Sequence, residues 1–176
     1  MALHSAGIKG LDETKEPHCA LTTCRILQYR LVQKTALKLL LVFVEYAESN
    51  CELLVEAIEA VDRNNREKPW SNVMKILCEK DANDPELLVF TMTLINMVCS
   101  SDLIINEAYS DRAFFFRTQT VQGIPDQDSF YDVVDSLEQL GMMDACEALR
   151  KRKTSDAELI QQVDIYDVRS SQKRKY

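Results

Sequence analysis

Two segments of this sequence are apolar on nearly every face of the helix that each would form. They are KTALKLLLVFVEYA at residues 34–47 and ELLVFTMTLINMV at residues 86–98. A helix without a polar face lies inside a protein, because its whole circumference must be kept from water. The sequence therefore predicts an all-α domain in which these two helices are buried.

Short polar breaks at residues 49–50, 63–66 and 81–84 separate the helical patterns. Gly and Pro are scarce, at four each, and only AFFFRTQTV at residues 113–121 has any resemblance to a strand. The chain of 176 residues is long enough for one domain. The expected helices cover Thr22–Glu48, Cys51–Val61, a segment from Pro69 to Leu77, a segment from Asp84 to Val98, Phe130–Leu140, a short segment from Met143 to Leu149, and a last one through Leu159, Ile160 and Val163.

Residues typical of helix ends support these boundaries. Pro69 can open a helix in its first turn, where a missing N–H costs nothing. Asp84-Pro85-Glu86 combines an N-cap, Pro at the first position and a carboxylate near the positive end of the helix dipole. Ser129 is a candidate N-cap, Gly141 a helix stop, and Ser155-Asp156-Ala157-Glu158 a capping box. Trp70 lies on an apolar stripe, which favours a core position over a binding role.

Alternating short and long buried helices suggest a helical solenoid, but the internal repeats disagree. LLVF occurs at Leu40–Phe43 and again at Leu87–Phe90, 47 residues later. ELLV occurs at Glu52–Val55 and Glu86–Val89, 34 residues apart. The two periods conflict, so the residues alone do not establish a repeat.

Charge and cysteine content narrow the class of protein. The net charge of −7 argues against binding to nucleic acid and suits a basic peptide partner. No apolar run is long enough to span a membrane and no signal peptide is visible, so we expect a cytoplasmic protein. The six cysteines contain no CxxC pair, and reduced thiols are expected in that compartment.

The carboxylates Asp126, Asp128 and Asp132 form the one cluster that could hold a metal or perform acid–base chemistry. A calcium loop starting at Asp126 would need Asp or Asn at 130, Gly at 131 and Glu at 137, where this chain has Phe130, Tyr131 and Leu137. The same aspartates are also explained without a metal, because carboxylates at the start of a helix are stabilised by the positive end of its dipole. A zinc site at His18, Cys19 and Cys24 lacks a second ligand pair. We therefore expect no enzyme, no metal and no cofactor, with a metal-dependent hydrolase as the remaining catalytic alternative.

Four long strings give the chain a family resemblance. RLVQKTALKLLLVFVEYAESN, KPWSNVMKILCEKD, DPELLVFTMTLIN and IPDQDSFYDVVDSLEQLGM resemble the N-terminal regulatory region of formins, specifically of the FHOD (formin homology-2 domain-containing) subfamily. The resemblance covers residues 30–98 and 123–168. It implies an armadillo-like helical superhelix, known as the third formin-homology region or diaphanous inhibitory domain.

The resemblance also implies a function, which is autoinhibition of a formin. The concave face of such a superhelix binds an amphipathic C-terminal autoregulatory helix, and this controls actin filament assembly and the organisation of the cytoskeleton. A Rho-family GTPase would act through a neighbouring domain, and actin only through the catalytic region. The partner-binding residues carried over from the family pattern are Val42, Glu45, Thr93 and Asn96. Burial in the core is the alternative for Val42, and a satisfied interior amide is the alternative for Asn96.

The chain departs from the family pattern in three places. Residues 1–29 show no resemblance, residues 99–122 are expected to be an insertion into a partial inhibitory domain spanning 30–168, and residues 169–176 are expected to be a disordered basic tail. A fragment or variant form of a longer formin is expected, and missing repeat neighbours would leave apolar faces free for self-association. A generic helical adaptor and a truncated non-functional remnant stay open as alternatives.

Metal titration separates the structural interpretation of Asp126, Asp128 and Asp132 from the hydrolase interpretation. We expect Ca²⁺, Mg²⁺ and Mn²⁺ each to leave the melting temperature unchanged, because ligand binding to the native state would raise it by mass action. Differential scanning fluorimetry with and without chelator measures this. A rise that is abolished by Asp128→Asn would favour the hydrolase.

Overall fold

The computed structural model describes residues 30–47, 49–79, 84–99, 127–152 and 156–173. These residues form seven α-helices and, within the same ranges, no strand. The helices are α2 (Arg30–Tyr46), α3 (Ser49–Asn64), α4 (Ser71–Cys78), α5 (Pro85–Val98), α6 (Gln127–Gln139), α7 (Met142–Lys151) and α8 (Ala157–Lys173). The predicted all-α fold is confirmed.

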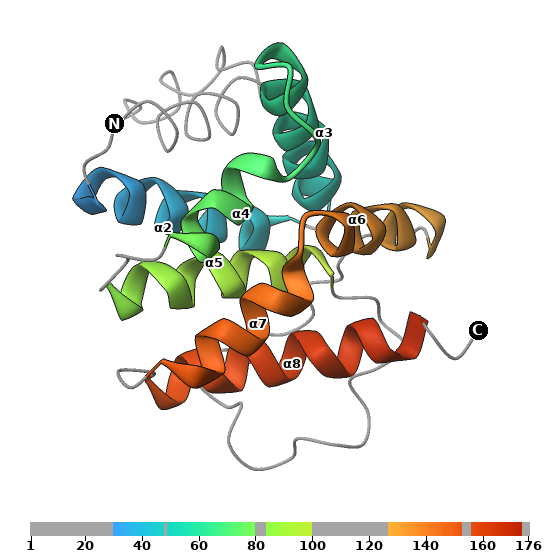
Figure 1. Cartoon of the computed structure of the whole chain (residues 1–176). Coiled ribbons are helices and arrows are strands. Elements are labelled where there is room, and N and C mark those ends of the chain that lie inside the picture. Colours follow the sequence, from blue (N-terminus) through green and yellow to red (C-terminus); the bar gives the residue numbers. More distant parts are fainter. Residues whose placement is uncertain (1–29, 48, 80–83, 100–126, 153–155, 174–176) are drawn as a thin grey trace, which may run out of the picture.

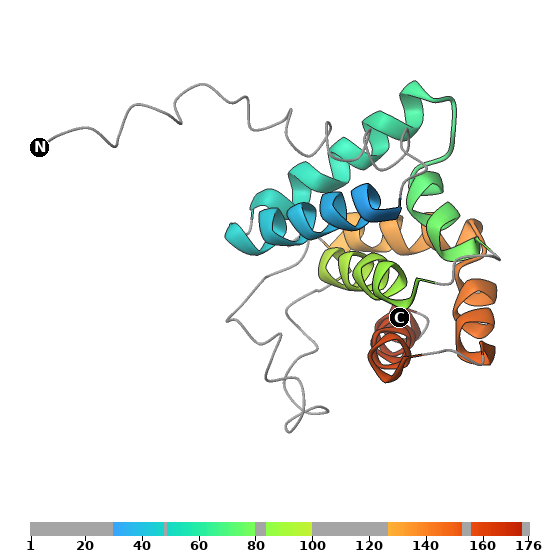
Figure 2. The same cartoon turned by 90° about the vertical axis from the view of Figure 1, so that its left-hand side faces the viewer.

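Three of the longer helices, α2, α5 and α8, form one layer. They run side by side in the same direction, with α5 in the middle packed against both neighbours (Figure 1). On one side of this layer α4 packs against α5 and α7 against α8, with α6 beside α7, whereas α3 packs against α2 at the edge of the layer (Figure 2). The groups α3–α4–α5 and α6–α7–α8 repeat one three-helix arrangement, so the domain is armadillo-like.

Burial explains why α5 is in the middle. Ten of its residues are buried, on every side except one strip, as its sequence predicts for a helix without a polar face. The buried residues of α2 instead occupy one side, which includes Leu37, Leu40 and Val44. The prediction of a helix buried on nearly every side is therefore confirmed for α5, whereas α2 is buried on one side only.

The structure resolves the conflict between the two internal repeats. LLVF lies in α2 and in α5, which are equivalent helices of successive repeats, so the 47-residue offset follows the architecture. ELLV lies in α3 and in α5, which occupy different positions within a repeat. That second match is a coincidence of common residues.

The start of α5 agrees with its sequence signals, whereas two other starts do not. The Asp84 carboxylate accepts a hydrogen bond from the Leu87 N–H at 3.3 Å, and Pro85 follows at the first helical position. Pro69 does not open a helix, because α4 begins two residues later, at Ser71. Ser129 is not an N-cap, because α6 begins at Gln127 and Ser129 lies within its first turn. Ser155 lies outside the described residues; Asp156 accepts from the Glu158 N–H at 3.4 Å.

The connection between α3 and α4 is built around two buried side chains. Trp70 is fully buried, as predicted, although its φ of 70° places a non-glycine residue in the left-handed region. Asp62 is also buried and accepts a hydrogen bond from the Asn72 side chain. Burial raises the pKa of the Asp62 carboxyl. Packing of the indole and the bond to Asp62 together set where α4 begins, which local sequence preferences could not show.

The expectation of a disordered tail from Arg169 is wrong for residues 169–173, because α8 continues to Lys173. Arg169 donates a hydrogen bond to the backbone oxygen of Asn96 in α5, and the small side chain of Ser170 is fully buried. These tertiary contacts stabilise a helix end that lacks an apolar repeat. The expected insertion at 99–122 lies outside the described residues except for the buried Cys99 at the end of α5.

The cysteines give a prediction that depends on pH. Burial raises the pKa of the Cys51, Cys99 and Cys146 thiols to about 12, whereas Cys78 is exposed. A thiol pKa that is higher in the folded than in the unfolded state contributes stability below the unfolded value, and this is lost as the pH rises towards 12. We expect iodoacetamide at pH 8 to modify Cys78 and to spare the three buried thiols, as read by peptide mass mapping. Equal labelling of these four thiols would contradict the burial of Cys51, Cys99 and Cys146.

Candidate partner-binding surface

The side of the three-helix layer away from α4 and α7 is the candidate surface. After its first residue, α5 leaves only Glu86 exposed and Phe90 and Met97 half-buried, and these three are spaced four and seven residues apart and so share one face of the helix. From α2, Val42 and Glu45 are exposed, and from α8 the half-buried Ile165 completes the strip. We call Val42, Glu45, Phe90, Met97 and Ile165 the outer face of the layer.

The structure separates the four residues that the family pattern assigned to partner binding. Val42 is 62% exposed and Glu45 lies one turn further along the same helix, also exposed. The alternative that Val42 is a core residue is therefore wrong. Thr93 and Asn96 are only 5% and 4% exposed, so in this conformation they offer almost no surface to a partner.

Asn96 acts as a link between two helices of the layer. Its Nδ2 donates to the backbone oxygen and to the side-chain Oε1 of Gln162 in α8, both at 2.8 Å. The Arg169 guanidinium of α8 donates to the backbone oxygen of Asn96. An interior amide is tolerated when its polar groups are bonded, and here those bonds join α5 to α8. Thr93 is satisfied locally, because its hydroxyl donates to the Val89 oxygen at 2.8 Å.

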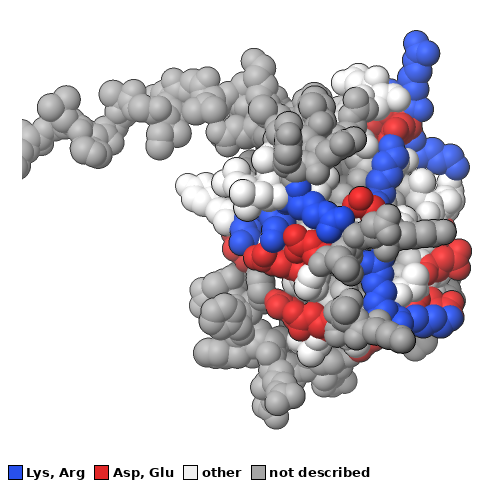
Figure 3. Space-filling view, turned by 60° about the vertical axis from the view of Figure 1, so that its left-hand side comes forward, with Lys and Arg blue, Asp and Glu red and all other residues white. Residues whose placement is uncertain are grey.

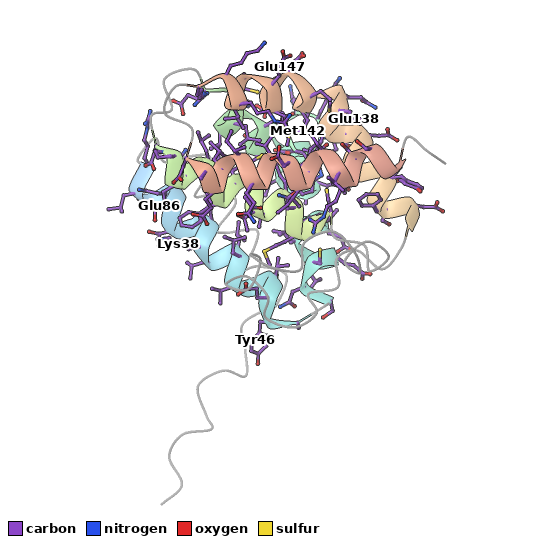
Figure 4. The ribbon with its side chains drawn as sticks, turned by 90° about the horizontal axis from the view of Figure 1, so that it is seen from below. Lys38, Tyr46, Glu86, Glu138, Met142 and Glu147 are labelled. Carbon is purple, nitrogen blue, oxygen red and sulfur yellow. The ribbon has the colours of Figure 1, made fainter. Side chains whose placement is uncertain are left out.

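A charged cluster lies where α2 meets the start of α5. Lys34 Nζ lies 2.9 Å from Glu86 Oε2 and 3.1 Å from Asp84 Oδ2, and Lys38 Nζ lies 3.1 Å from Glu86 Oε1. Lys38 also lies 4.8 Å from the centre of the Phe90 ring, within range of a cation–π interaction. Figure 4 shows Lys38 and Glu86 side by side, with Tyr46 at the far end of α2.

The cluster shifts the pKa values of its members in the directions that ion pairing requires. The hydrogen bond from Lys34 lowers the pKa of the Glu86 carboxyl, and the bond to Glu86, followed by that to Asp84, raises the pKa of Lys34. Acidic and basic side chains are mixed in this part of the surface, as Figure 3 shows. The excess of negative charge in the whole sequence is therefore not concentrated around these lysines.

Sequence reasoning did not identify Phe90, Met97 or Ile165. In α5 no signal was available, because a helix that is apolar all round does not reveal which strip stays uncovered. In α8, Ile165 falls two residues after the expected core position Val163, on another side of the helix.

The acidic cluster is only partly described. Asp126 lies outside the described residues, as do His18, Cys19 and Cys24. Asp128 and Asp132 are exposed one turn apart on α6. Across the ranges that the structure covers, no group of three or more His, Cys, Asp or Glu side chains could hold a metal ion, and no helix could span a membrane.

Comparison with known proteins decides the family. The family model described as the FHOD1/3 FH3 domain matches residues 2–108, which is more than half of the chain. The chain belongs to the FHOD formin family. The resemblance seen in the four sequence strings is thereby confirmed. The matched range also includes residues 2–29, for which the strings gave no resemblance, and ends within the segment that was expected to be an insertion.

Individual FHOD relatives are similar along most of the chain. FH1/FH2 domain-containing protein 3 of Homo sapiens is 45% identical over 166 residues, which cover 94% of this chain and 10% of the relative. The protein of the same name from Mus musculus is 45% identical over the same length, covering 9% of that relative. FH1/FH2 domain-containing protein 1 of Homo sapiens is 44% identical over 150 residues, or 83% of this chain and 11% of the relative. The chain thus spans about a tenth of the length of these FHOD formins.

The position of Asn96 gives a prediction about stability. Asn96→Asp replaces the donating amide with a carboxylate that faces the Gln162 oxygen, so a buried donor is lost and like partial charges meet. We expect the free energy of unfolding to fall by roughly 2–3 kcal/mol, the cost of a buried polar group left unpaired. Urea denaturation followed by circular dichroism measures it, with Glu45→Gln as the surface control. An unchanged midpoint would show that Asn96 does not link the helices.

Proposed function

We propose that this chain is a non-catalytic interaction module of a formin, and that the outer face of its layer binds an amphipathic autoregulatory helix. The bound helix would come from the C-terminal region of a formin, and its binding would control actin filament assembly and the organisation of the cytoskeleton. The observation that carries the proposal is the accessible strip formed by Val42, Phe90 and Met97 in a row of parallel helices.

The chemistry of this strip supports a helical partner. Amphipathic helices bind through apolar anchors spaced three and four residues apart, with charged residues at the edges of the contact. The outer face offers apolar side chains from all three helices of the layer, and Glu45 lies at its edge. A carboxylate there would favour a partner with basic residues beside its apolar anchors.

The membership of the FHOD family supports the wider role. We propose that a Rho-family GTPase acts through a neighbouring domain of the longer protein and that actin contacts only the catalytic region. In this scheme the module works in the cytoplasm in association with the cytoskeleton. The role of Thr93 and Asn96 is then indirect, since Asn96 holds α8 in line with α5 and so keeps Ile165 beside the α5 strip.

The proposal is tested by binding of a fluorescent, basic amphipathic autoregulatory peptide of the same subfamily. We expect the complete chain to bind it, and Val42→Glu and Phe90→Ala each to raise the Kd about tenfold or more, because truncation or charging of a central anchor removes 1–3 kcal/mol. Fluorescence anisotropy measures the Kd. Asn96→Asp is unsuitable here, because its effect on folding would also lower the fraction of competent protein.

A matched control separates the outer face from general effects of surface charge. Met143 is an exposed apolar residue on α7, on the covered side of the layer, and Met143→Glu should leave the Kd unchanged. Unchanged affinity in both Val42→Glu and Phe90→Ala would remove the outer face as the site. No binding by the wild-type chain would contradict the proposed partner and favour a generic adaptor or a remnant.

A further inference from the structure

Arg169 of α8 is a cation that no carboxylate of the described residues neutralises. Its side chain is half-buried, and the one bond that its guanidinium makes within the described ranges goes from Nη1 to the backbone oxygen of Asn96 in α5. Burial lowers the pKa of Arg169, and the nearby Cys99 thiol supplies no charge at neutral pH because burial raises its pKa to about 12. A guanidinium stays protonated in proteins, so Arg169 is a half-buried positive charge whose natural partner, an anion, does not come from these residues.

The acidic residues of α8 that come closest to Arg169 in sequence are bound elsewhere. Asp164 and Asp167 precede it by five and two residues, and both pair with Arg150 of α7. A step of two residues turns a side chain by about 200° around a helix, so Asp167 and Arg169 lie on different sides of α8. The two aspartates therefore hold α8 to α7 and leave Arg169 to the other side of the helix.

That other side is part of the outer face. Arg169 lies one turn beyond Ile165 on α8, and Asn96, to which it donates, is next in sequence to Met97. Because α5 and α8 run side by side in the same direction, this contact lies where the last turn of α5 meets the C-terminal half of α8 (Figure 1). The guanidinium thus borders the outer face at its α8 end.

A second group of N–H donors lies on the same side of α8. Gln162 is three residues before Ile165, and its Oε1 accepts from Asn96 Nδ2 at 2.8 Å. Because Oε1 is the acceptor in this bond, the Nε2 amide of Gln162 keeps its donors for another partner. Arg169 likewise uses only one of its five N–H groups on Asn96. Donors therefore lie on both sides of the apolar Ile165.

We propose that Arg169 is a specificity-determining residue of the outer face and that it binds a carboxylate, carried by an Asp or Glu side chain of the bound helix. This inference rests on the proposed function, because it names the chemistry of the partner of that same surface. A planar guanidinium can hold a carboxylate through two parallel N–H···O bonds, and such charge-assisted bonds are about twice as strong as neutral ones. The Gln162 amide offers a neutral hydrogen bond on the other side of Ile165.

The charges at the two ends of the outer face then set the direction of the bound helix. Glu45 on α2 favours basic residues of the partner, whereas Arg169 on α8 favours an acidic one, and α5 lies between them with Phe90 and Met97. Neighbouring helices pack about 8–10 Å apart, so α2 and α8 are separated by roughly 16–20 Å. At 1.5 Å per residue, a helix that crosses the layer has its acidic and basic residues roughly eleven to thirteen positions apart.

A double-mutant cycle tests the proposal with the complete chain and the fluorescent autoregulatory peptide. A series of peptides replaces each Asp or Glu singly by Asn or Gln. Arg169→Gln removes the charge and keeps an N–H donor for the Asn96 oxygen. We expect Arg169→Gln to raise the Kd of the unmodified peptide about tenfold, and to leave the Kd of one amide-substituted peptide unchanged, because that peptide lacks the carboxylate. Fluorescence anisotropy measures both, and a loss of folded variant would affect every peptide alike.

The control variant is Arg63→Gln, which removes an exposed guanidinium on α3 and should leave the Kd of every peptide unchanged. If Arg169→Gln weakens all peptides by the same factor, the residue has a structural role only and the proposal is overturned while the proposed function stands. If the unmodified peptide does not bind the wild-type chain, the proposed function fails, and this inference fails with it.

Nuclear magnetic resonance reads the contact directly. The Nε–Hε signal of Arg169, assigned by its absence in Arg169→Gln, should shift when the unmodified peptide saturates the chain. It should stay in place with the amide-substituted peptide that the cycle identifies. A signal that does not move in the saturated complex would overturn the carboxylate contact.

Discussion

The burial of α5 between α2 and α8 is the constraint on which the rest of this domain depends. Because α5 has no polar face, it is stable only when neighbours cover nearly all of it, and two parallel helices provide that cover on its two sides. The strip that stays accessible, with Phe90 and Met97, is thereby reduced to one narrow line between two other helices. The apolar content of one segment in this way determines both the core and the position of the candidate binding surface.

Polar contacts then fix how the three helices align. At one end Lys34 and Lys38 of α2 pair with Asp84 and Glu86 at the start of α5, where the same Asp84 also caps the helix. At the other end the Asn96 amide and the Arg169 guanidinium join α5 to α8. Apolar packing alone has little directional preference, whereas these bonds have a required geometry. They keep the side chains of the outer face in register across three separate helices.

The four residues carried over from the family pattern show why a sequence motif is not yet a site. All four lie on α2 or α5, but Val42 and Glu45 face solvent while Thr93 and Asn96 are buried. The difference arises because α2 is at the edge of the layer and α5 is in its middle. Position in the row cannot be inferred from either helix alone. The same reason explains why the exposed apolar residues of α2 were not anticipated, since its sequence resembles that of a fully buried helix.

What the sequence by itself determined is the all-α class, the existence of the helices, the capped start of α5 and the membership of the FHOD formin family, because these depend on local periodicity, capping and strings of residues. What only the tertiary structure decided is which helix is central, where α4 and α6 begin, and that α8 extends through Arg169 and Ser170 to Lys173. Those outcomes depend on contacts between residues far apart in the chain, such as Arg169 with Asn96. The energy of such contacts exceeds the weak local preferences that a sequence displays.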